Sequence, residues 1–585
     1  MTLPYSLNRF GGAKYKPYYC EVEYLESSGT QYIDTGYKPV GTETEYVIVY
    51  ETPTNKQCSL FGACETDDSQ WTGIPYYTPA TPPNNRLALA DNSNQNIIVE
   101  SANKKYKYTL TVNDQNNTWE IKHTDLSTGE VENPSGSYTG SYVKNYNIFL
   151  FGNNKGGVVV QRISGRIHKY SIKQDGVLVR DFIPVLDWDM IPCMYDRVSD
   201  QLFYNQGTGS FTYGREIHYV DYLESTGTQY INTGFNPNNN TYIKVDFQGI
   251  NTIASTVELP YGCGNYWGGK ASGGNWRMYV NNTLSSTLID TITQESYNGE
   301  KHSVGIDKNI GFFDSSTAEL PSSAYQTTIP IYLFASNNNG TVAFQSTIKM
   351  FRALIKDNNV LIRDYYPAVD ENGIGFMFDR VEHKIYDNLG TGAFKYPDIK
   401  LEYLESTASQ VIDTGVAIES DVDFDMDVQV LEAYSGYVPM GAYVNGAILL
   451  YQLYVNTQNQ GLRMVSNGSN TIMTTVADSL NRHKIQIYYS SMKYSIDGSD
   501  LSSIAGSFVD STLTYTIFGR RTANGYDCYA KLRVYSLKMD KAGSTVRDYK
   551  PILRNGVAGL LDTANDVFYT NLGTGTFLFK IKERK

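Results

Sequence analysis

The sequence predicts an all-β protein that consists of three tandem β-sandwich domains. Segments such as TYIKVDFQ (241–248), KYKYTLTV (105–112) and HKIQIYYS (483–490) alternate apolar and polar residues or are rich in Val, Ile, Tyr and Phe. This is the pattern of strands that bury one face. Clusters of Gly, Asn, Asp and Pro separate these segments, and helix patterns are scarce. Many short strands with turn signals at close intervals are typical of a sandwich or jelly roll.

A block of fifteen residues occurs three times and gives the number of domains. It reads VEYLESSGTQYIDTG from residue 22, VDYLESTGTQYINTG from residue 220 and LEYLESTASQVIDTG from residue 401. A second block, YDRVSDQLFYNQGTGSF in its first copy, begins at residues 195, 378 and 561. The period is far longer than the roughly 20 to 50 residues of a solenoid unit. Each copy is therefore a whole domain.

These blocks set the predicted boundaries. An N-terminal arm covers residues 1–20, and the three sandwiches cover 21–215, 216–398 and 399–585. A chain of 585 residues also exceeds what one hydrophobic core usually serves. About 190 residues per copy suits a large sandwich better than an immunoglobulin-type sandwich of about 100 residues.

The composition argues against two classes of partner. The net charge is −12, whereas binding to a phosphate backbone needs clustered Lys and Arg, so we expect no nucleic acid. No stretch approaches the roughly 20 apolar residues of a membrane span, so we expect no membrane insertion. The N-terminal segment MTLPYSLNRFGGAKYKPYYC has no apolar run of signal-peptide length.

The six cysteines do not occupy equivalent positions in the three copies. Only Cys58 and Cys64 are close enough in sequence to suggest a local pair, and the sequence leaves open whether they form one. Because the others are scattered and no CxxC zinc pattern occurs, we expect free buried thiols.

Several motifs recur in the same order in each copy. YLES and QYIDTG come first, then LFG, GRIHKYSIKQDGVLVRDFIP (165–184) and FYNQGTGSF (203–211). This order resembles the laminin G-like branch of the concanavalin A-like lectin/glucanase superfamily, in particular domains of gut bacterial surface proteins and of virion proteins of tailed phages, including crAss-like phages. The resemblance implies three tandem concanavalin A-like jelly-roll sandwiches. It leaves the function open, because one fold hosts many activities.

The fifteen-residue block is better explained by structure than by catalysis. Glu26 and Asp34 could form a pair of acids, but Asn232 replaces the second acid in the second copy, and an Asn cannot serve as a general acid or base. We expect a hairpin in which the acid and the Gln bond backbone groups at a glycine-containing turn. The GTG of the closing block is likewise expected to be a turn, because no helix follows that could hold a phosphate.

The most polar feature that all three copies share is an Arg-Asp pair. It could bind a ligand carboxylate or sugar hydroxyls. Alternation along a strand places the two side chains on opposite faces, so a structural role at a strand end is favoured. The three pairs are Arg180 with Asp181, Arg363 with Asp364, and Arg547 with Asp548.

We expect no catalytic residues. The resemblance to glucanases implies two carboxylates on one strand in an ExDxxE-type motif, but the nearest run, ESDVDFDMDV (419–428), lacks the closing Glu and is not repeated in the other copies. Carboxylates on one face at Asp421, Asp423 and Asp425 are a candidate calcium site if loops supply further oxygens. The alternative is an acidic, solvated strand face, and no other cofactor is expected.

Aromatic residues in the loops that differ between copies are the candidate glycan contacts. Aromatic faces stack on sugar rings, and loops on a rigid scaffold usually carry recognition. The alternative is that these residues cover a hydrophobic edge or contact another subunit. The candidates are Trp71, Tyr76, Tyr77, Trp267 and Trp276.

Together these features predict a non-enzymatic structural or adhesive protein of a phage virion, such as a head fibre, a capsid decoration or a tail-associated protein. Its expected partners are other virion proteins, its own copies, and glycans of the host surface or mucus. Arg9, Lys14 and Lys16 in the arm are the expected anchor to the particle. The alternatives are a carbohydrate-binding adhesin on a bacterial surface and, third, a glycoside hydrolase.

Overall fold

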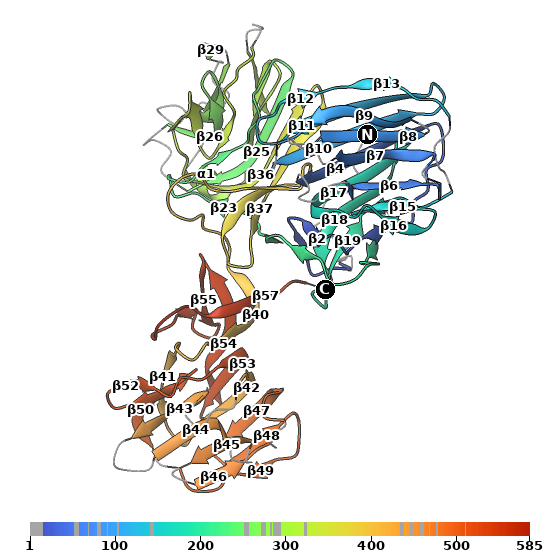
Figure 1. Ribbon diagram of the computed structural model, residues 1–585. Helices are drawn as coiled ribbons and strands as arrows, with labels where there is room; N and C mark the ends of the chain where they lie inside the picture. The colour runs from blue at the N-terminus through green and yellow to red at the C-terminus, as the bar shows by residue number, and fades with distance from the viewer. Residues whose placement is uncertain are drawn as a thin grey trace. The chain divides into compact units, whose positions relative to one another are not determined.

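The computed structural model describes residues 16–584 except 52–57, 68, 79–83, 91, 102–103, 141–144, 251–256, 271–275, 281–282, 285–293, 321–324, 433–437, 445–448, 457–460, 467–468, 475–477 and 509. The fold is all-β, as predicted (Figure 1), and the one helix among these residues is α1 (Gln294–Gly299). The chain forms two compact units, one of residues 1–395 with 583–585 and one of residues 396–582. The second unit begins three residues before the predicted third domain.

The first sandwich has a sheet built around a long central strand. In β4 (Glu43–Glu51) apolar residues such as Ile48 are buried while alternate residues lie nearer the surface, as expected of a sheet with one covered face. Its neighbours in order are β11 (Thr118–Asp125), β10 (Lys105–Asn113), then β4, then β17 (Ser164–Gln174), β18 (Val177–Leu186), β19 (Pro192–Asp196) and β20 (Gln201–Phe203). Figure 1 shows β10, β4 and β17 side by side.

A second layer covers this sheet. It contains β16 (Val158–Val160), β15 (Asn153–Lys155), β6 (Phe61–Cys64), β14 (Phe149–Leu150) and β3 (Ile33–Asp34). A separate four-stranded sheet contains β5 (Cys58–Ser59), β7 (Trp71–Thr78), β8 (Asn84–Ala90) and β9 (Asn92–Val99).

The second and third sandwiches repeat this order. The second has β30 (His302–Asp307), β25 (Thr241–Gly249), β36 (Ile348–Asp357), β37 (Val360–Val369) and β38 (Gly375–Asp379). The third has β47 (Arg482–Tyr488), β42 (Val422–Val430), β53 (Leu532–Lys541), β54 (Ser544–Arg554) and β55 (Val557–Asp562). The opposing sheets centre on β26 (Glu258–Cys263), β27 (Tyr266–Lys270) and β28 (Trp276–Val280), and on β50 (Ser511–Ile517), β43 (Met440–Val444) and β44 (Leu449–Asn456).

Aromatic side chains from the central strand fill each core. Ring centroids lie 5.3 Å apart for Tyr46 and Phe61 in the first sandwich and 5.1 Å apart for Phe247 and Trp276 in the second. In the third sandwich Phe424 on β42 and Tyr515 on β50 are 4.8 Å apart. Burial of such side chains stabilises the fold by about 1.5 to 3 kcal/mol each. The abundance of Tyr in the sequence therefore serves the cores as well as the surface.

The fifteen-residue block does not form the predicted hairpin. Its first strand, β2 (Leu25–Ser28), pairs with β17 in one layer, and its second, β3, pairs with β14 in the other. The block is a corner that takes the chain from one sheet to the opposite sheet. The prediction was wrong about the pairing because a strand, a glycine turn and a strand have the same sequence pattern whether or not the two strands bond each other.

Within the first compact unit, backbone strand pairing connects the first sandwich to the second. Strand β1 (Cys20–Val22) pairs with β18 of the first sandwich and with β22 (Glu216–Tyr219), the first strand of the second. Side chains cross the same boundary: Lys169 Nζ donates to the carbonyl of Val381 at 3.1 Å, and Lys384 Nζ donates to that of Leu126 at 3.0 Å. The two copies are therefore joined by a continuous sheet.

Candidate functional site: repeated scaffold and exposed surfaces

The Gln that all three copies of the block share joins the beginning of each sandwich to its end. Gln31 is buried, and its Oε1 accepts hydrogen bonds from Ser28 N at 2.9 Å and Ser27 Oγ at 3.0 Å. Its Nε2 donates to the carbonyl of Ser210, next to the GTG turn, at 3.0 Å. The equivalent bonds run from Gln229 to Ala393 at 3.1 Å and from Gln410 to Thr576 at 2.8 Å. The block is thus a structural fastening repeated three times.

The position that alternates between Asp and Asn caps a turn. The side-chain oxygens of Asp34, Asn232 and Asp413 accept hydrogen bonds from the backbone N–H two residues later, at 2.9, 2.9 and 3.0 Å. An amide oxygen accepts this bond as a carboxylate does, which explains the Asn in the second copy. Glu26 contacts Arg166 at 3.4 Å. Both acids considered for catalysis therefore have structural partners.

The GTG motif is held against the turn of the fifteen-residue block. A Cβ at Gly207 would collide with the carbonyl oxygen of Thr30, and the same is true for Gly390 against Thr228 and Gly573 against Ser409. Only glycine permits this approach. This packing accounts for the motif without a bound phosphate.

The Arg-Asp pair belongs to the same fastening. Arg180 Nε lies 3.6 Å from the fully buried Asp196 and donates to the carbonyl of Thr35 at 3.3 Å. Asp181, on the opposite face, accepts from Arg197 Nε at 2.8 Å. The pair lies inside β18, not at a strand end as predicted. Arg363 and Arg547 contact Asp379 at 3.7 Å and Asp562 at 3.6 Å in the same way.

The acidic run lies on the face of β42 that points away from the core. Asp423 accepts hydrogen bonds from Ser490, Asp425 accepts one from Gln486 at 3.3 Å, and Asp427 forms a two-pronged bond with Arg482 at 2.7 and 2.8 Å. One oxygen of Asp421 is buried without a hydrogen-bond partner.

These carboxylates do not form a metal-ligand cluster in the structure. Among the described residues, one group of three side chains brings potential metal-ligand atoms within 4.8 Å of one another, and it consists of Cys20, Glu216 and His218. Calcium at Asp421, Asp423 and Asp425 stays a prediction.

The tryptophans of the second sandwich point in opposite directions. Trp276 is fully buried against Phe247 and against Phe313, whose ring centroid is 4.7 Å away. Its ring has no free face, so the prediction of a glycan contact at Trp276 was wrong. Residue type alone does not show which face a side chain occupies, whereas strand parity does: in WRMYV, alternation places Trp276 and Tyr279 on different faces.

Trp267 forms a partly exposed aromatic pair with Tyr279. The two residues are direct cross-strand neighbours on β27 and β28, with ring centroids 5.3 Å apart and planes inclined by 18°. Arg277 lies on the same face two residues before Tyr279, and its Nε is buried without a hydrogen-bond partner. We call Trp267, Tyr279 and Arg277 the aromatic patch. The sequence prediction included Trp267 but missed the other two, although strand parity could have indicated them.

The remaining candidates lie partly outside the described residues. Trp71, Tyr76 and Tyr77 are in β7, whose side chains are not among those described. Arg9 and Lys14 of the predicted anchor lie in residues 1–15, also outside the description. Lys16 is held by the fold: its Nζ donates to the carbonyl of Tyr19 at 2.8 Å and lies 3.3 Å from Glu583.

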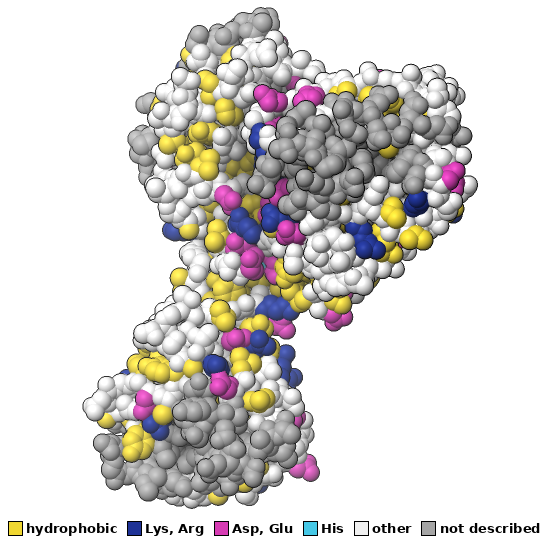
Figure 2. All heavy atoms as spheres, in the orientation of Figure 1, with side chains coloured by type: hydrophobic (Ala, Val, Ile, Leu, Met, Phe, Trp, Pro, Cys, Tyr) yellow, Lys and Arg dark blue, Asp and Glu magenta, His cyan; other side chains and the backbone are white. Residues whose placement is uncertain are grey.

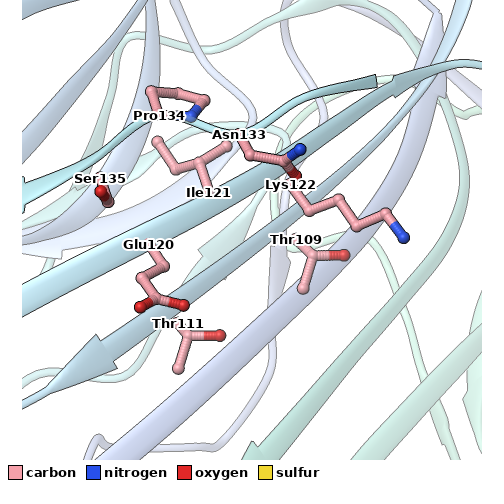
Figure 3. Close-up of a pocket in the computed structure, with 8 residues that line it drawn as sticks. All are labelled: Thr109, Thr111, Glu120, Ile121, Lys122, Asn133, Pro134 and Ser135. Atoms are coloured by element: carbon pink, nitrogen blue, oxygen red, sulfur yellow. The ribbon is translucent and has the colours of Figure 1, made fainter. Parts of the chain in front are cut away.

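A polar hollow lies on the outer face of the first sandwich (Figure 3). Its volume is about 400 Å³, and Figure 3 shows Glu120 beside Thr111 and Lys122 beside Thr109, across the pair β10 and β11. It is lined by Thr109, Thr111, Glu120, Ile121, Lys122, Asn133, Pro134 and Ser135. Hydroxyl, amide, carboxylate and ammonium groups meet here, but no aromatic ring does. No motif in the sequence predicts this hollow.

The cysteines lie mostly in the interior, and charged side chains of both signs share the surface. None of the six cysteines forms a disulfide, and all except Cys528 are buried. This confirms the expectation of buried thiols for five of them and shows that Cys58 and Cys64 are not a disulfide pair. On the face drawn in Figure 2, Lys and Arg side chains lie next to Asp and Glu. Within the described part of the chain, no helix is long and apolar enough to cross a membrane.

Comparisons with known proteins find similarity at the level of solved structures. No protein-family model matches the chain, and no curated protein matches it. The LG1-3 region of the laminin alpha2 chain is 9% identical over 94% of this chain and 98% of that one, with a TM-score of 0.22. Domains LG4-5 of the mouse laminin alpha1 chain are 11% identical over 62% of this chain and 95% of that one, with a TM-score of 0.22.

A carbohydrate-binding module is also similar. The Ruminococcus gnavus IT-sialidase CBM40 bound to alpha2,3 sialyllactose is 15% identical over 28% of this chain and 92% of that one, with a TM-score of 0.19. Similarity this weak does not indicate what this chain binds.

Proposed function

We propose that this chain is a non-catalytic adhesive protein whose second sandwich binds carbohydrate at the aromatic patch. The observation that supports this most is the pair of nearly parallel rings of Trp267 and Tyr279, which lies on the outer face of the sheet. Such a pair offers an apolar surface to the C–H face of a sugar ring, and the buried Nε of Arg277 is a donor that lacks a protein partner.

The proposal that the chain is not an enzyme rests on the structural roles of its acidic residues. Glu26, Asp34 and Asp427 each have an ion pair or a backbone hydrogen bond that a catalytic acid would have to give up. A glycoside hydrolase also needs two carboxyl groups at a defined separation, about 5 to 5.5 Å for the retaining class.

Glycan binding is tested with an array and with titration of the ligands that bind. We expect Trp267→Ala to weaken binding about 10-fold or more, which corresponds to roughly 1.4 kcal/mol. The matched control is Phe312→Ala, because Phe312 stacks on Tyr242 at 5.9 Å on the other sheet of the same sandwich. Equal affinity of wild type and Trp267→Ala would contradict the proposal.

We also propose that the protein is a component of a phage virion. The support is the resemblance of its motifs to virion proteins and the tandem arrangement of sandwiches, which suits display on a particle. Gold-labelled antibody against the chain should decorate purified particles. Labelling of intact uninfected bacteria, with none on particles, would favour the alternative of a bacterial surface adhesin.

A further inference from the structure

A mixed cluster of metal-ligating side chains lies where the first two sandwiches join. Strand β1 runs antiparallel to β22, with Glu21 opposite Ile217 and Val22 opposite Glu216. Continued by one residue, this register places Cys20 opposite His218, so that Cys20, Glu216 and His218 project from the same face of the sheet. Their ligand atoms lie within 4.8 Å of one another.

The histidine has a carboxylate on each side. His218 Nε2 lies 2.8 Å from Glu216 Oε2, and Nδ1 lies 2.7 Å from Glu583 Oε1. A neutral imidazole has one N–H, so it can donate to only one of these carboxylates. The ring nitrogen without a proton faces the other carboxylate and cannot donate to it. Either a second proton on this nitrogen or a cation between the nitrogen and the carboxylate would make this contact favourable. The His218 side chain is only 3% exposed, and the ring of Tyr19 covers it at a centroid distance of 5.7 Å.

We propose that Cys20, Glu216 and His218 bind a zinc ion through Sγ, a carboxylate oxygen and Nε2. Sulfur, nitrogen and oxygen donors together select Zn²⁺ over Ca²⁺ or Mg²⁺, which take oxygen. The ligand atoms of a tetrahedral zinc are about 3.3 to 3.6 Å apart. The three ligand atoms here lie within 4.8 Å of one another, so small side-chain movements would bring them to that separation. The fourth position is left for water. When zinc binds, the thiol proton leaves to solvent and any second imidazole proton leaves with it.

Glu583 is the positioning residue of this site. A zinc-bound histidine usually donates its other N–H to a carboxylate, which fixes the ring and its tautomer. Glu583 occupies that position on Nδ1, and Lys16 Nζ holds it at 3.3 Å. The ion would link the beginning of the first sandwich, the beginning of the second and residue 583 within one compact unit.

The test uses the full chain, stripped with a chelator, dialysed and titrated with zinc. We expect one equivalent to bind, and we expect Cys20→Ser and His218→Gln each to abolish that binding. Glu583→Gln should weaken it about 10- to 100-fold. The matched controls are Cys263→Ser, which changes another fully buried thiol, and His302→Gln, which changes a buried histidine paired with Asp314 at 2.8 Å. Neither should change the stoichiometry.

Cobalt substitution makes the result independent of how the variants fold. Wild-type protein with Co²⁺ should show the thiolate-to-cobalt charge-transfer band together with the visible bands of a tetrahedral site. Absence of the thiolate band would overturn the proposal, as would zinc binding that survives both Cys20→Ser and His218→Gln in folded protein. If no zinc binds at all, His218 is a doubly hydrogen-bonded imidazolium and the metal site is refuted.

Discussion

Replacement of Gln229 by Met tests whether the repeated block is a structural fastening. Met has nearly the same volume, so the substitution removes hydrogen bonds without opening a large cavity. The two shortest bonds to backbone groups among those lost are Thr226 N to Oε1 at 2.8 Å and Nε2 to the carbonyl of Ala393 at 3.1 Å. Gln229 is 1% exposed, so water cannot readily replace it. At about 1 to 1.5 kcal/mol per bond, the local free energy of unfolding should fall by about 2 to 3 kcal/mol.

Hydrogen exchange read by mass spectrometry is the suitable assay, because a chain of several domains does not unfold in one two-state transition. A loss of 2 to 3 kcal/mol corresponds to exchange about 30- to 150-fold faster in peptides that cover residues 223–235 and 388–395. The matched control is Asn232→Asp, which restores the residue of the other copies and keeps the acceptor for Gly234 N. Acceleration below about threefold in Gln229→Met would refute the fastening.

Three further predictions concern stability and reactivity. Trp276→Ala should lower the unfolding free energy of the second sandwich by about 3 to 5 kcal/mol, whereas Trp267→Ala should change it little; similar acceleration of hydrogen exchange in the peptides of this sandwich would contradict the opposite orientations. Burial lowers the pKa of His483, but hydrogen bonds, chiefly to Asp497, outweigh it and raise the pKa above its usual 6.5. The stability from this pair is therefore complete below pH 6.5 and is lost as the pH rises through the folded pKa, so the third sandwich should melt lower at pH 8 than at pH 6, and His483→Gln should reduce this difference. A thiol reagent should modify about one cysteine in the native chain, Cys528, and six in urea; fast reaction of several native thiols would contradict their burial.

The sequence predicted the strands well because alternation and burial share a cause. In β25, TYIKVDFQG, every second residue is buried along the whole strand, and the same pattern predicted the elements of the other copies. The number of copies followed from the two repeated blocks. Neither feature shows which strands bond each other. The sequence pattern therefore predicts a hairpin of β2 and β3, although these strands pair with β17 and β14 in different layers.

The candidate surfaces were harder to predict because they depend on residues that are distant in sequence. Trp267 and Trp276 look equivalent as residue types, but one lies on the outer face and the other in the core. The partner of Trp267 is on the next strand and could have been found by parity. The cluster of Cys20 with His218 joins positions almost two hundred residues apart, and only the pairing of β1 with β22 brings them together.

The pairing of β1 with β22 limits how freely the copies can be separated. A fragment that ends at residue 215 would leave the N–H and C=O groups of Glu21 without the partners that Ile217 provides, and such a bare strand edge recruits other chains. Recombination or gene truncation between the first two copies would therefore produce a product inclined to self-associate. The first two copies would then be inherited and exchanged as a pair, although the sequence repeats them as if they were separate modules.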